Sequence, residues 1–205
     1  MLAGAGDSYP LPFPLALPGC RYTYLGRIGV FHAARVLLKR AGDLALAPAY
    51  HNGLEIQALR TAGATVRFFN LDRRLEPDLD EIRRGLRDGA KLVLVIHFNG
   101  WPQPIEQIRA LCRDHGAALI EDCALAFLSG RGDAPLGSFG DASVFSLYKT
   151  LAVPNGGALV FNGKESAEIA ALQWRNPGAM STLARTTELA ITWVQIGRAS
   201  CRERV

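Results

Sequence analysis

The sequence predicts an α/β fold with three αβα layers built on a mostly parallel sheet. Short apolar runs alternate along the chain with segments of about ten residues that have helical periodicity. Two of the runs, LVLVIH at 92–97 and AALIED at 117–122, are apolar almost throughout, which is typical of strands buried on both faces. Because crossovers between parallel strands are right-handed, helices should cover both faces of the sheet.

In the first half of the chain, turn residues separate the predicted elements. Residues 1–19 are rich in proline and are expected to be irregular. The helical pattern VFHAARVLLKR at 30–40 ends before an Ala-Gly-Asp stop signal, and a proline closes the apolar run LALA at 44–47. A second helical pattern at 54–62 ends at a glycine, and TVRFFN at 65–70 is predicted to be a strand.

The same alternation continues through the second half. The helix predicted over 78–86 carries acidic residues in its first turn, where the helix dipole favours them. The helix over 105–115 ends at a glycine and connects the two buried strands. Strands at 142–146 and 158–161 and a helix at 164–174 complete the predicted elements.

Composition limits the classes of protein to consider. The chain has 205 residues, 49% of them hydrophobic, which is enough for one domain with a core. No run of 18 apolar residues occurs, so we expect no membrane partner. The net charge of +4 is spread along the chain, so we expect no nucleic-acid partner. The four cysteines fit neither a metal-site nor a disulfide spacing, and reduced thiols in the cytoplasm are expected.

The last ten residues, IGRASCRERV, resemble the translation of a common sequencing adapter. We therefore expect the natural protein to continue beyond Val194 and this chain to be a truncated gene product. The expected organisation is an irregular lead at 1–19, a cofactor-binding domain at 20–175, the start of a truncated C-terminal region at 176–195 and a foreign tail at 196–205.

Polar side chains follow three of the predicted strands, at the sheet edge where α/β proteins bind ligands. Asp122 ends one strand, Ser146 ends another, and Lys149 follows Ser146 by three residues. Pyridoxal phosphate needs a lysine for a Schiff base, a carboxylate for its ring nitrogen and hydroxyls or amides for its phosphate. Each residue alone has an ordinary structural explanation. His97, at a third strand end, is interpreted as a hydrogen-bonded structural histidine.

Longer strings make the assignment more specific. LIEDCALAF, LGSFGDASVFSLYKT and the later Gly156-Gly157 pair resemble the DegT/DnrJ/StrS family of aminotransferases, most of which act on nucleotide-linked sugars. The strings at 44–72 and 95–116 agree with it. The resemblance implies the large domain of the aspartate-aminotransferase-like fold (fold type I), with the small C-terminal domain missing.

The resemblance also implies roles for individual residues. Lys149 matches the Schiff-base lysine and is the expected catalytic residue, Asp122 matches the partner of the ring nitrogen, and Ser146 matches a serine that binds phosphate. A loop before the first helix would bind the phosphate through its amides, at a helix N-terminus suited to anions. The residues expected in that loop are Gly26, Arg27 and Ile28.

Two positions depart from the family pattern. Leu125 stands where a hydrogen-bonding Gln or His often faces the ring oxygen of the cofactor. Asn52 stands where an aromatic ring often stacks on the cofactor. The neighbouring Tyr50 or His51 could stack there instead or be an ordinary loop residue, and all three residues are expected in the cofactor-binding site. No metal site is expected.

We therefore predict a pyridoxal-phosphate-dependent aminotransferase that takes an amino group from an amino acid and gives it to a keto group of a nucleotide-activated sugar. The resemblance implies a homodimer when the protein is full length. The truncated chain is expected to be inactive. The alternatives are a non-catalytic cofactor-binding relative or inactive fragment, and a lyase or desulfurase on the same fold.

Overall fold

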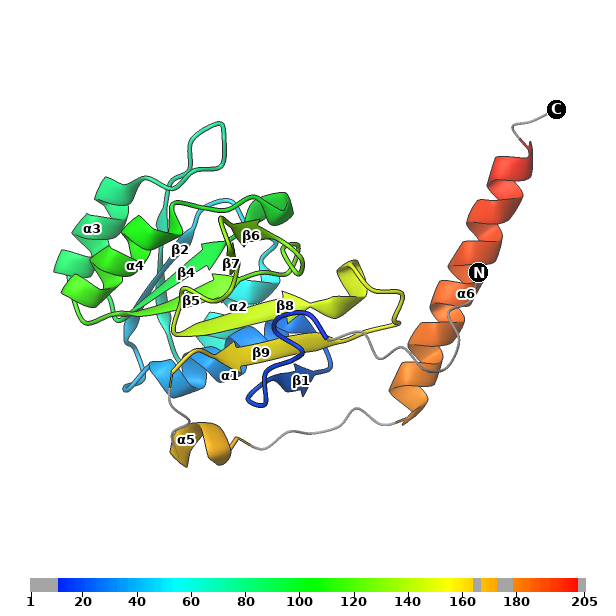
Figure 1. Ribbon diagram of the computed structural model, residues 1–205, viewed down its shortest axis with the longest axis horizontal. Helices are drawn as coiled ribbons and strands as arrows, with labels where there is room; N and C mark the ends of the chain where they lie inside the picture. Colours follow the sequence, from blue (N-terminus) through cyan, green and yellow to red (C-terminus); the bar gives the residue numbers. More distant parts are fainter. Residues whose placement is uncertain (1–10, 164–166, 173–178, 203–205) are drawn as a thin grey trace.

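A seven-stranded sheet lies between two pairs of helices (Figure 1). The computed structural model describes residues 11–163, 167–172 and 179–202, with backbone alone for 167, 168 and 195–202. The strands, in their order across the sheet, are β1 (Arg21–Thr23), β9 (Gly157–Phe161), β8 (Ala142–Ser146), β5 (Ala118–Asp122), β4 (Leu92–Ile96), β2 (Leu44–Pro48) and β3 (Thr65–Phe69). Within this sheet β9 is antiparallel to both of its neighbours, and the other six strands point the same way. The predicted mostly parallel sheet is confirmed.

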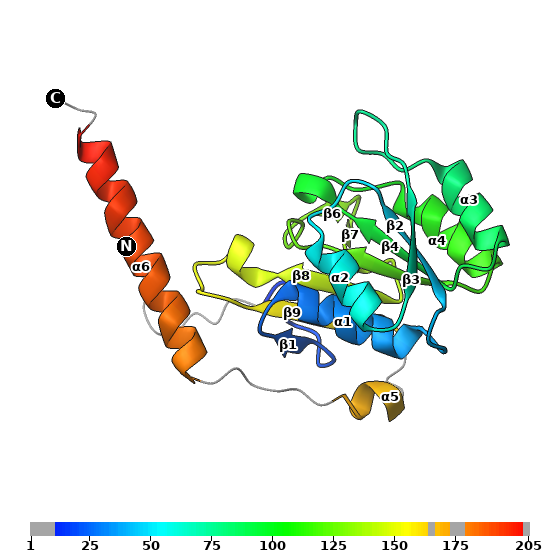
Figure 2. The same cartoon turned by 180° about the vertical axis from the view of Figure 1, so that it is seen from behind.

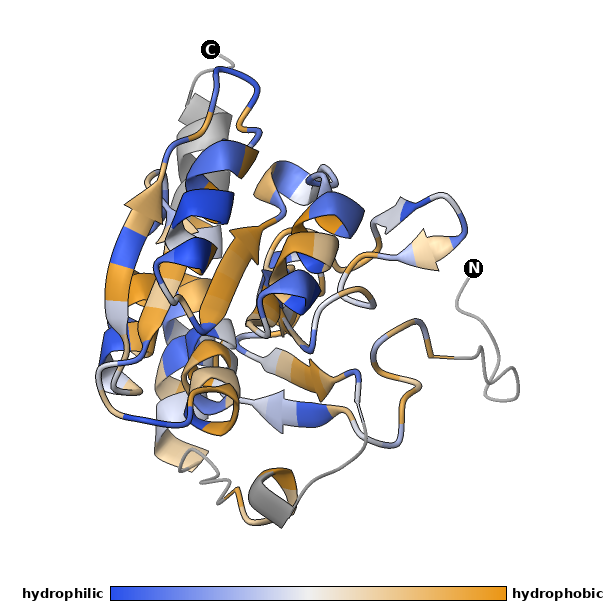
Figure 3. Cartoon of the chain, turned by 90° about the vertical axis from the view of Figure 1, so that its left-hand side faces the viewer, coloured by the Kyte–Doolittle hydropathy of each residue, from blue (hydrophilic) through white to orange (hydrophobic). Residues whose placement is uncertain are grey.

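The helices divide between the two faces of the sheet, as the right-handed crossovers require (Figures 1 and 2). Helices α1 (Gly26–Leu37) and α2 (Leu54–Thr61) pack on one face, and α3 (Leu79–Arg87) and α4 (Ile105–Asp114) pack on the other. Strand β4 shows the alternation, because Leu92 and Leu94 join the α1–α2 core whereas Val93 and Val95 join the α3–α4 core. The apolar strands between amphipathic helices stand out in Figure 3.

A third apolar cluster closes one end of the sheet. Phe127 and Phe145 meet edge to face with ring centroids 6.3 Å apart, and Phe13 packs on Phe145 at 5.9 Å. The described part of the proline-rich lead, residues 11–20, forms turns without helix or strand, as predicted. Its apolar side chains therefore cover the segment between β5 and β8, which contains the small hairpin of β6 (Gly130–Arg131) and β7 (Ala134–Pro135).

Four differences from the sequence-based expectation concern the chain's elements. Helix α1 begins at Gly26, four residues before the predicted start. The three-residue strand β1, the hairpin and the short 3-10 helices η1 (Phe98–Gly100) and η2 (Leu147–Lys149) were not predicted. Within the helix predicted over 164–174, the structure describes α5 (Ala167–Ala170) and a turn after it; residues 164–166, 173 and 174 lie outside the described part. Helix α6 (Ala179–Arg202) was also not predicted, and it runs into the segment interpreted as a foreign tail.

Helix α6 extends from the body of the domain (Figures 1 and 2). Its described apolar side chains are largely exposed, among them Met180, Leu183 and Trp193. The hydroxyls of Tyr24 and Ser181, 2.7 Å apart, form a contact between α6 and the segment that precedes α1. Across the described segments, no helix is both long and apolar enough to span a membrane.

Three cysteines in the described part of the chain, Cys20, Cys112 and Cys123, are free thiols. Burial raises the pKa of Cys20 to about 11 and that of Cys112 to about 12. The thiolate is the reactive form of cysteine, so these thiols are suited to packing rather than to nucleophilic chemistry.

Candidate active site

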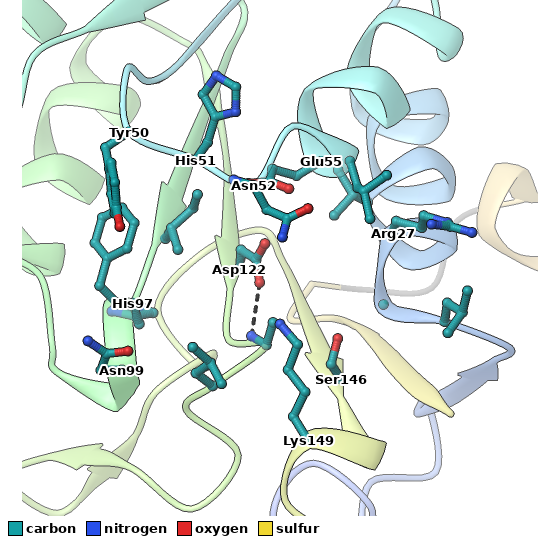
Figure 4. A pocket seen from close by; sticks show the side chains of 18 of the residues that line it. Arg27, Tyr50, His51, Asn52, Glu55, His97, Asn99, Asp122, Ser146 and Lys149 are labelled. Carbon is teal, nitrogen blue, oxygen red and sulfur yellow. Dashed lines mark hydrogen bonds between the residues drawn. The ribbon is translucent and has the colours of Figure 1, made fainter. Parts of the chain in front are cut away.

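A cavity of about 420 Å³ opens at the carboxyl ends of β2, β4, β5 and β8, beside the start of α1 (Figure 4). Such a volume suits a small ligand or cofactor. Eight of the nine site residues expected from the sequence line this cavity: Gly26, Arg27, Tyr50, His51, Asn52, Asp122, Ser146 and Lys149. Leu125, the departure from the family pattern, also lines it and is 47% exposed.

Asp122 ends β5 and is buried, with 8% of the residue exposed. Its Oδ1 accepts a hydrogen bond from the Ala124 N–H at 2.9 Å. Burial raises the pKa of Asp122 to about 6, against the lowering effect of the Ala124 hydrogen bond; Glu55 raises it further, while Lys149 and His97 lower it. A cationic ligand beside this carboxylate would favour its ionised form.

Lys149 and Ser146 come from the end of β8 and the turn of η2 that follows it. The Lys149 side chain extends toward Asp122 (Figure 4). Ser146 is 6% exposed, and within the described residues its hydroxyl has no hydrogen-bond partner. A short strand and a tight turn thus place an amine, a hydroxyl and a carboxylate around one cavity.

Helix α1 begins against that hydroxyl. A Cβ atom built on Gly26 would overlap the Ser146 Oγ, so a larger residue at this position would force the hydroxyl to move away from the start of the helix. Leu25 provides no side-chain cap and the first turn contains no acidic residue. The first N–H groups of a helix have no intrahelical partner, and a helix N-terminus attracts anions. Ile28 is the one expected residue outside the cavity lining, and its N–H bonds to the Leu25 carbonyl at 3.0 Å.

The loop after β2 carries three of the expected cofactor-binding residues. The His51 ring stacks on Phe68, with centroids 5.2 Å apart and planes at 18°, and it points away from Asp122 (Figure 4). Tyr50 packs against Phe98 at 5.7 Å. Asn52 points toward Asp122 (Figure 4). Both aromatic rings therefore already have aromatic partners within the protein.

Glu55 is a cavity residue that the sequence reasoning did not single out. It lies in the first turn of α2, is 7% exposed and accepts a hydrogen bond from the Asn52 N–H at 2.7 Å. A Glu just after a glycine at a helix start is the available sequence signal, but it equally predicts an ordinary helix cap.

His97 lines the cavity and belongs to a buried network behind it. The Gln103 N–H donates to His97 Nδ1 at 3.2 Å, so Nε2 carries the proton and donates to Glu121 Oε2 at 3.0 Å. The Glu121 carboxylate also accepts from the backbone N–H groups of Gly137, Phe139 and Gly140. Although Cys123 lies close enough to complete a metal-ligand triad with His97 and Glu121, the protein's own donors already occupy the carboxylate. The network matches the structural interpretation of His97.

The model of the DegT/DnrJ/EryC1/StrS aminotransferase family matches residues 31–192. The chain belongs to this family. A GDP-perosamine synthase of Vibrio cholerae is 29% identical over 140 residues, covering 67% of this chain and 38% of that protein. A dTDP-4-dehydro-2,3,6-trideoxy-D-glucose 4-aminotransferase of Saccharopolyspora spinosa is 33% identical over 135 residues, covering 64% of this chain and 35% of that protein. The chain thus spans little more than a third of these relatives.

Solved structures support the fold. The aminotransferase TlmJ from Streptoalloteichus hindustanus has a TM-score of 0.64 and 28% identity, covering 71% of this chain and 40% of that chain. DesI in the presence of its TDP-sugar product has a TM-score of 0.64 and 29% identity, covering 74% and 38%. The predicted fold, that of pyridoxal-phosphate-dependent sugar aminotransferases of fold type I, is confirmed over this part of their length.

Proposed function

We propose that this site binds pyridoxal phosphate and that the protein transfers an amino group from an amino-acid donor to a keto group of a nucleotide-linked sugar. The observation that carries the proposal is the convergence of Lys149, Asp122 and Ser146 on one cavity beside the uncapped start of α1. The names of the relatives, GDP-perosamine synthase and a dTDP-sugar 4-aminotransferase, support the substrate class.

The residues present fit this cofactor. The Ser146 hydroxyl lacks a protein partner within the described residues and lies against the space that a Gly26 side chain would fill, which suits a phosphate there. Asp122 would face the ring nitrogen, and Lys149 would hold the cofactor covalently. When bound, pyridoxal phosphate supplies an electron sink for the carbon that carries the transferred amine.

The three side chains would then act in different ways. When the amine of the donor has taken its place on the cofactor, the free Lys149 Nζ would accept the proton from the carbon that carries this amine and give it back, as a general base and acid. The Asp122 carboxylate would favour a protonated ring nitrogen, and burial would strengthen this charge interaction because it excludes water. Ser146 and the start of α1 would hold the phosphate, so that the reacting carbon meets Lys149 in one orientation.

Lys149 also separates this proposal from a dehydratase function. A GDP-4-keto-6-deoxymannose-3-dehydratase shares the fold, with a TM-score of 0.65 at 20% identity, so the fold alone does not separate the two reactions. The resemblance to the family implies that its dehydratases lack this lysine, and Lys149 therefore favours aminotransfer.

Borohydride reduction in the presence of pyridoxal phosphate, followed by peptide mapping, tests the proposal. We expect the label on Lys149 alone, and none after Lys149→Ala. Exposed Lys91 provides the matched control, because Lys91→Ala should leave the labelling unchanged. Label on Lys91, or equal labelling of both lysines, would contradict the site.

The alternative is a relative that binds the cofactor without catalysis. Leu125 favours it, since its side chain lines the cavity and forms no hydrogen bond where the family often has one. Half-transamination with glutamate, followed by absorbance, separates the two when it is measured on a form of the protein as long as its relatives, because a non-catalytic relative would bind the cofactor and leave its spectrum unchanged. A homodimer and a cytoplasmic location stay predictions.

A further inference from the structure

Glu55 is a buried carboxylate in the wall of the cavity. It is 7% exposed, and Oε1 accepts one hydrogen bond from the Asn52 N–H. Among the described residues, Oε2 has no hydrogen-bond donor and no Lys, Arg or His forms an ion pair with the carboxylate. Burying an ionised carboxylate is unfavourable unless a cation or further donors compensate it.

Helix capping does not explain this burial. Glu81, in the first turn of α3, also orders the loop before its helix, since it accepts hydrogen bonds from the backbone and side-chain amides of Asn70 at 2.6 and 2.9 Å. Both oxygens of Glu81 are used, and its side chain is 26% exposed next to Arg84. A first-turn glutamate at the surface can therefore order the loop before its helix. Glu55 orders its loop from inside the cavity, and only one of its two carboxylate oxygens accepts a hydrogen bond from the described residues.

Asp122 lines the same cavity and, like Glu55, receives only one backbone donor (Figure 4). The titratable groups that act on Asp122 are Glu55, Lys149 and His97. His97 donates a hydrogen bond to Glu121, and the two basic residues that line the cavity, Arg27 and Lys149, are both exposed. Among the described residues, the buried part of the cavity lining thus contains two carboxylates and no Lys or Arg.

We propose, resting on the function proposed above, that Glu55 is a positioning residue that acts with Asp122: the two buried carboxylates together favour a cationic ring nitrogen in the cofactor. Glu55 adds a second negative charge to the wall of the cavity that Asp122 lines. The bound ring therefore keeps its proton to a higher pH than Asp122 alone would allow. No bond is made or broken at Glu55.

The variant Glu55→Gln tests the charge separately from the fold, because the amide oxygen can still accept from the Asn52 N–H. Glu81→Gln is the matched control, with the same chemical change at the cap of α3. The probe is pyridoxine 5′-phosphate, which has the ring and the phosphate but no aldehyde to react with Lys149. Its ultraviolet absorbance reports ring protonation, and its dissociation constant is measured over pH 6–9.

We expect Glu55→Gln to weaken pyridoxine phosphate binding at neutral pH about tenfold and to lower the pH at which the bound ring loses its proton by about one unit. Binding of inorganic phosphate should not change, and Glu81→Gln should behave as the parent chain. An unchanged deprotonation pH in Glu55→Gln would overturn the inference, as would a loss of inorganic phosphate binding equal to the loss of pyridoxine phosphate binding.

If the parent chain binds pyridoxine phosphate but the two variants do not differ, only the role of Glu55 fails. If the parent chain takes neither this probe nor the Lys149 label, the proposed function fails with it.

Discussion

Helices α1 and α3 each begin beyond the carboxyl end of a strand, but their N-termini are built in opposite ways. At α3 the Asp78 side chain accepts from the N–H groups of Asp80 and Glu81, and both of these residues are acidic. At α1 there is no side-chain cap and no acid, and the first two residues, Gly26 and Arg27, line the cavity.

The difference separates a structural helix end from a functional one. The start of α3 has its own acceptors, which lowers the free energy of the folded chain. The start of α1 leaves donors and a positive dipole end facing Ser146, where a bound anion would satisfy them. The same contrast holds for the carboxylates. Asp78 is exposed and accepts two hydrogen bonds from backbone N–H groups, whereas Asp122 is buried and accepts one. Polar groups at the cavity therefore reduce stability, while those at α3 increase it.

The largest expected change in stability comes from a substitution that would push the start of α1 away from the sheet. A Cβ on Gly157 would lie 2.8 Å from the Gly26 nitrogen, 2.9 Å from the Leu25 carbonyl carbon and 2.5 Å from the Thr23 Oγ1. The backbone of β9 and the start of α1 would have to separate, so Gly157→Ala should cost at least about 3 kcal/mol of unfolding free energy. Urea denaturation measures it, with exposed Gly163→Ala as the control, since a Cβ there meets nothing within 4 Å. Equal stability of the two variants would refute the close approach.

Removing the buried charge of Asp122 should have the opposite sign. Its folded pKa of about 6 lies above the unfolded value of 3.8, so between these values the folded chain holds a proton that the unfolded chain has lost. Stability therefore falls as pH rises from about 4 to 6 and stays lower above it.

Asp122→Asn keeps an oxygen for the Ala124 N–H and lacks this charge. We expect it to stabilise the cofactor-free chain by about 2–3 kcal/mol at pH 8, with the difference disappearing near pH 4. Thermal unfolding across this pH range measures the gain. A loss of stability at pH 8 would show that the carboxylate is compensated within the protein.

A smaller effect should follow from giving α1 the acidic first turn of α3. Arg27 is exposed and lines the cavity, so Arg27→Glu changes its charge without altering the core. Inorganic phosphate should bind about tenfold more weakly, because the new carboxylate opposes the anion. The helix itself should gain about 0.5 kcal/mol from an acid at its N-terminus. Isothermal calorimetry and thermal unfolding measure the two effects, and Arg27→Gln should fall between the parent chain and Arg27→Glu in phosphate binding. Tighter phosphate binding in Arg27→Glu would contradict an anion site at this end.

The same contrast explains what the sequence could predict. The α3 helix was predicted over 78–86 and spans Leu79–Arg87. The two ranges agree within one residue because the acidic residues of its first turn can be recognised in the sequence. The α1 helix was predicted from residue 30 and begins at Gly26, since a helix end kept open for a ligand lacks the capping signal. Strand β1 was missed because three residues that pair with β9 carry no pattern of their own.

Prediction of the site follows the same logic. Asp122, Ser146 and Lys149 were identified because they follow apolar strands whose carboxyl ends meet at one edge of the sheet. The partners of Tyr50 and His51 depend on Phe98 and Phe68, which are distant in sequence. Glu55 was not identified because a glutamate in a first turn looks the same whether its oxygens face solvent or a cavity.

The smallest expected effect tests the structural end of the comparison. Asp78→Ala removes the acceptor of the Asp80 and Glu81 N–H groups, at 2.9 and 3.0 Å, from an exposed helix start. Loss of such a cap costs about 1 kcal/mol, and phosphate binding at the cavity should stay unchanged, because α3 lies on the other face of the sheet. Asp78→Asn, which keeps an oxygen acceptor, should recover most of the loss. Chemical denaturation and calorimetry on the three chains measure both quantities.

The sign of the change in unfolding free energy separates the two aspartates. Asp78→Ala should destabilise the chain, whereas Asp122→Asn should stabilise it. If both substitutions changed stability in the same direction, the Asp122 carboxylate would be as well compensated within the protein as the Asp78 cap. The contrast between a helix start stabilised by its own residues and a cavity that leaves polar groups for a ligand would then be wrong.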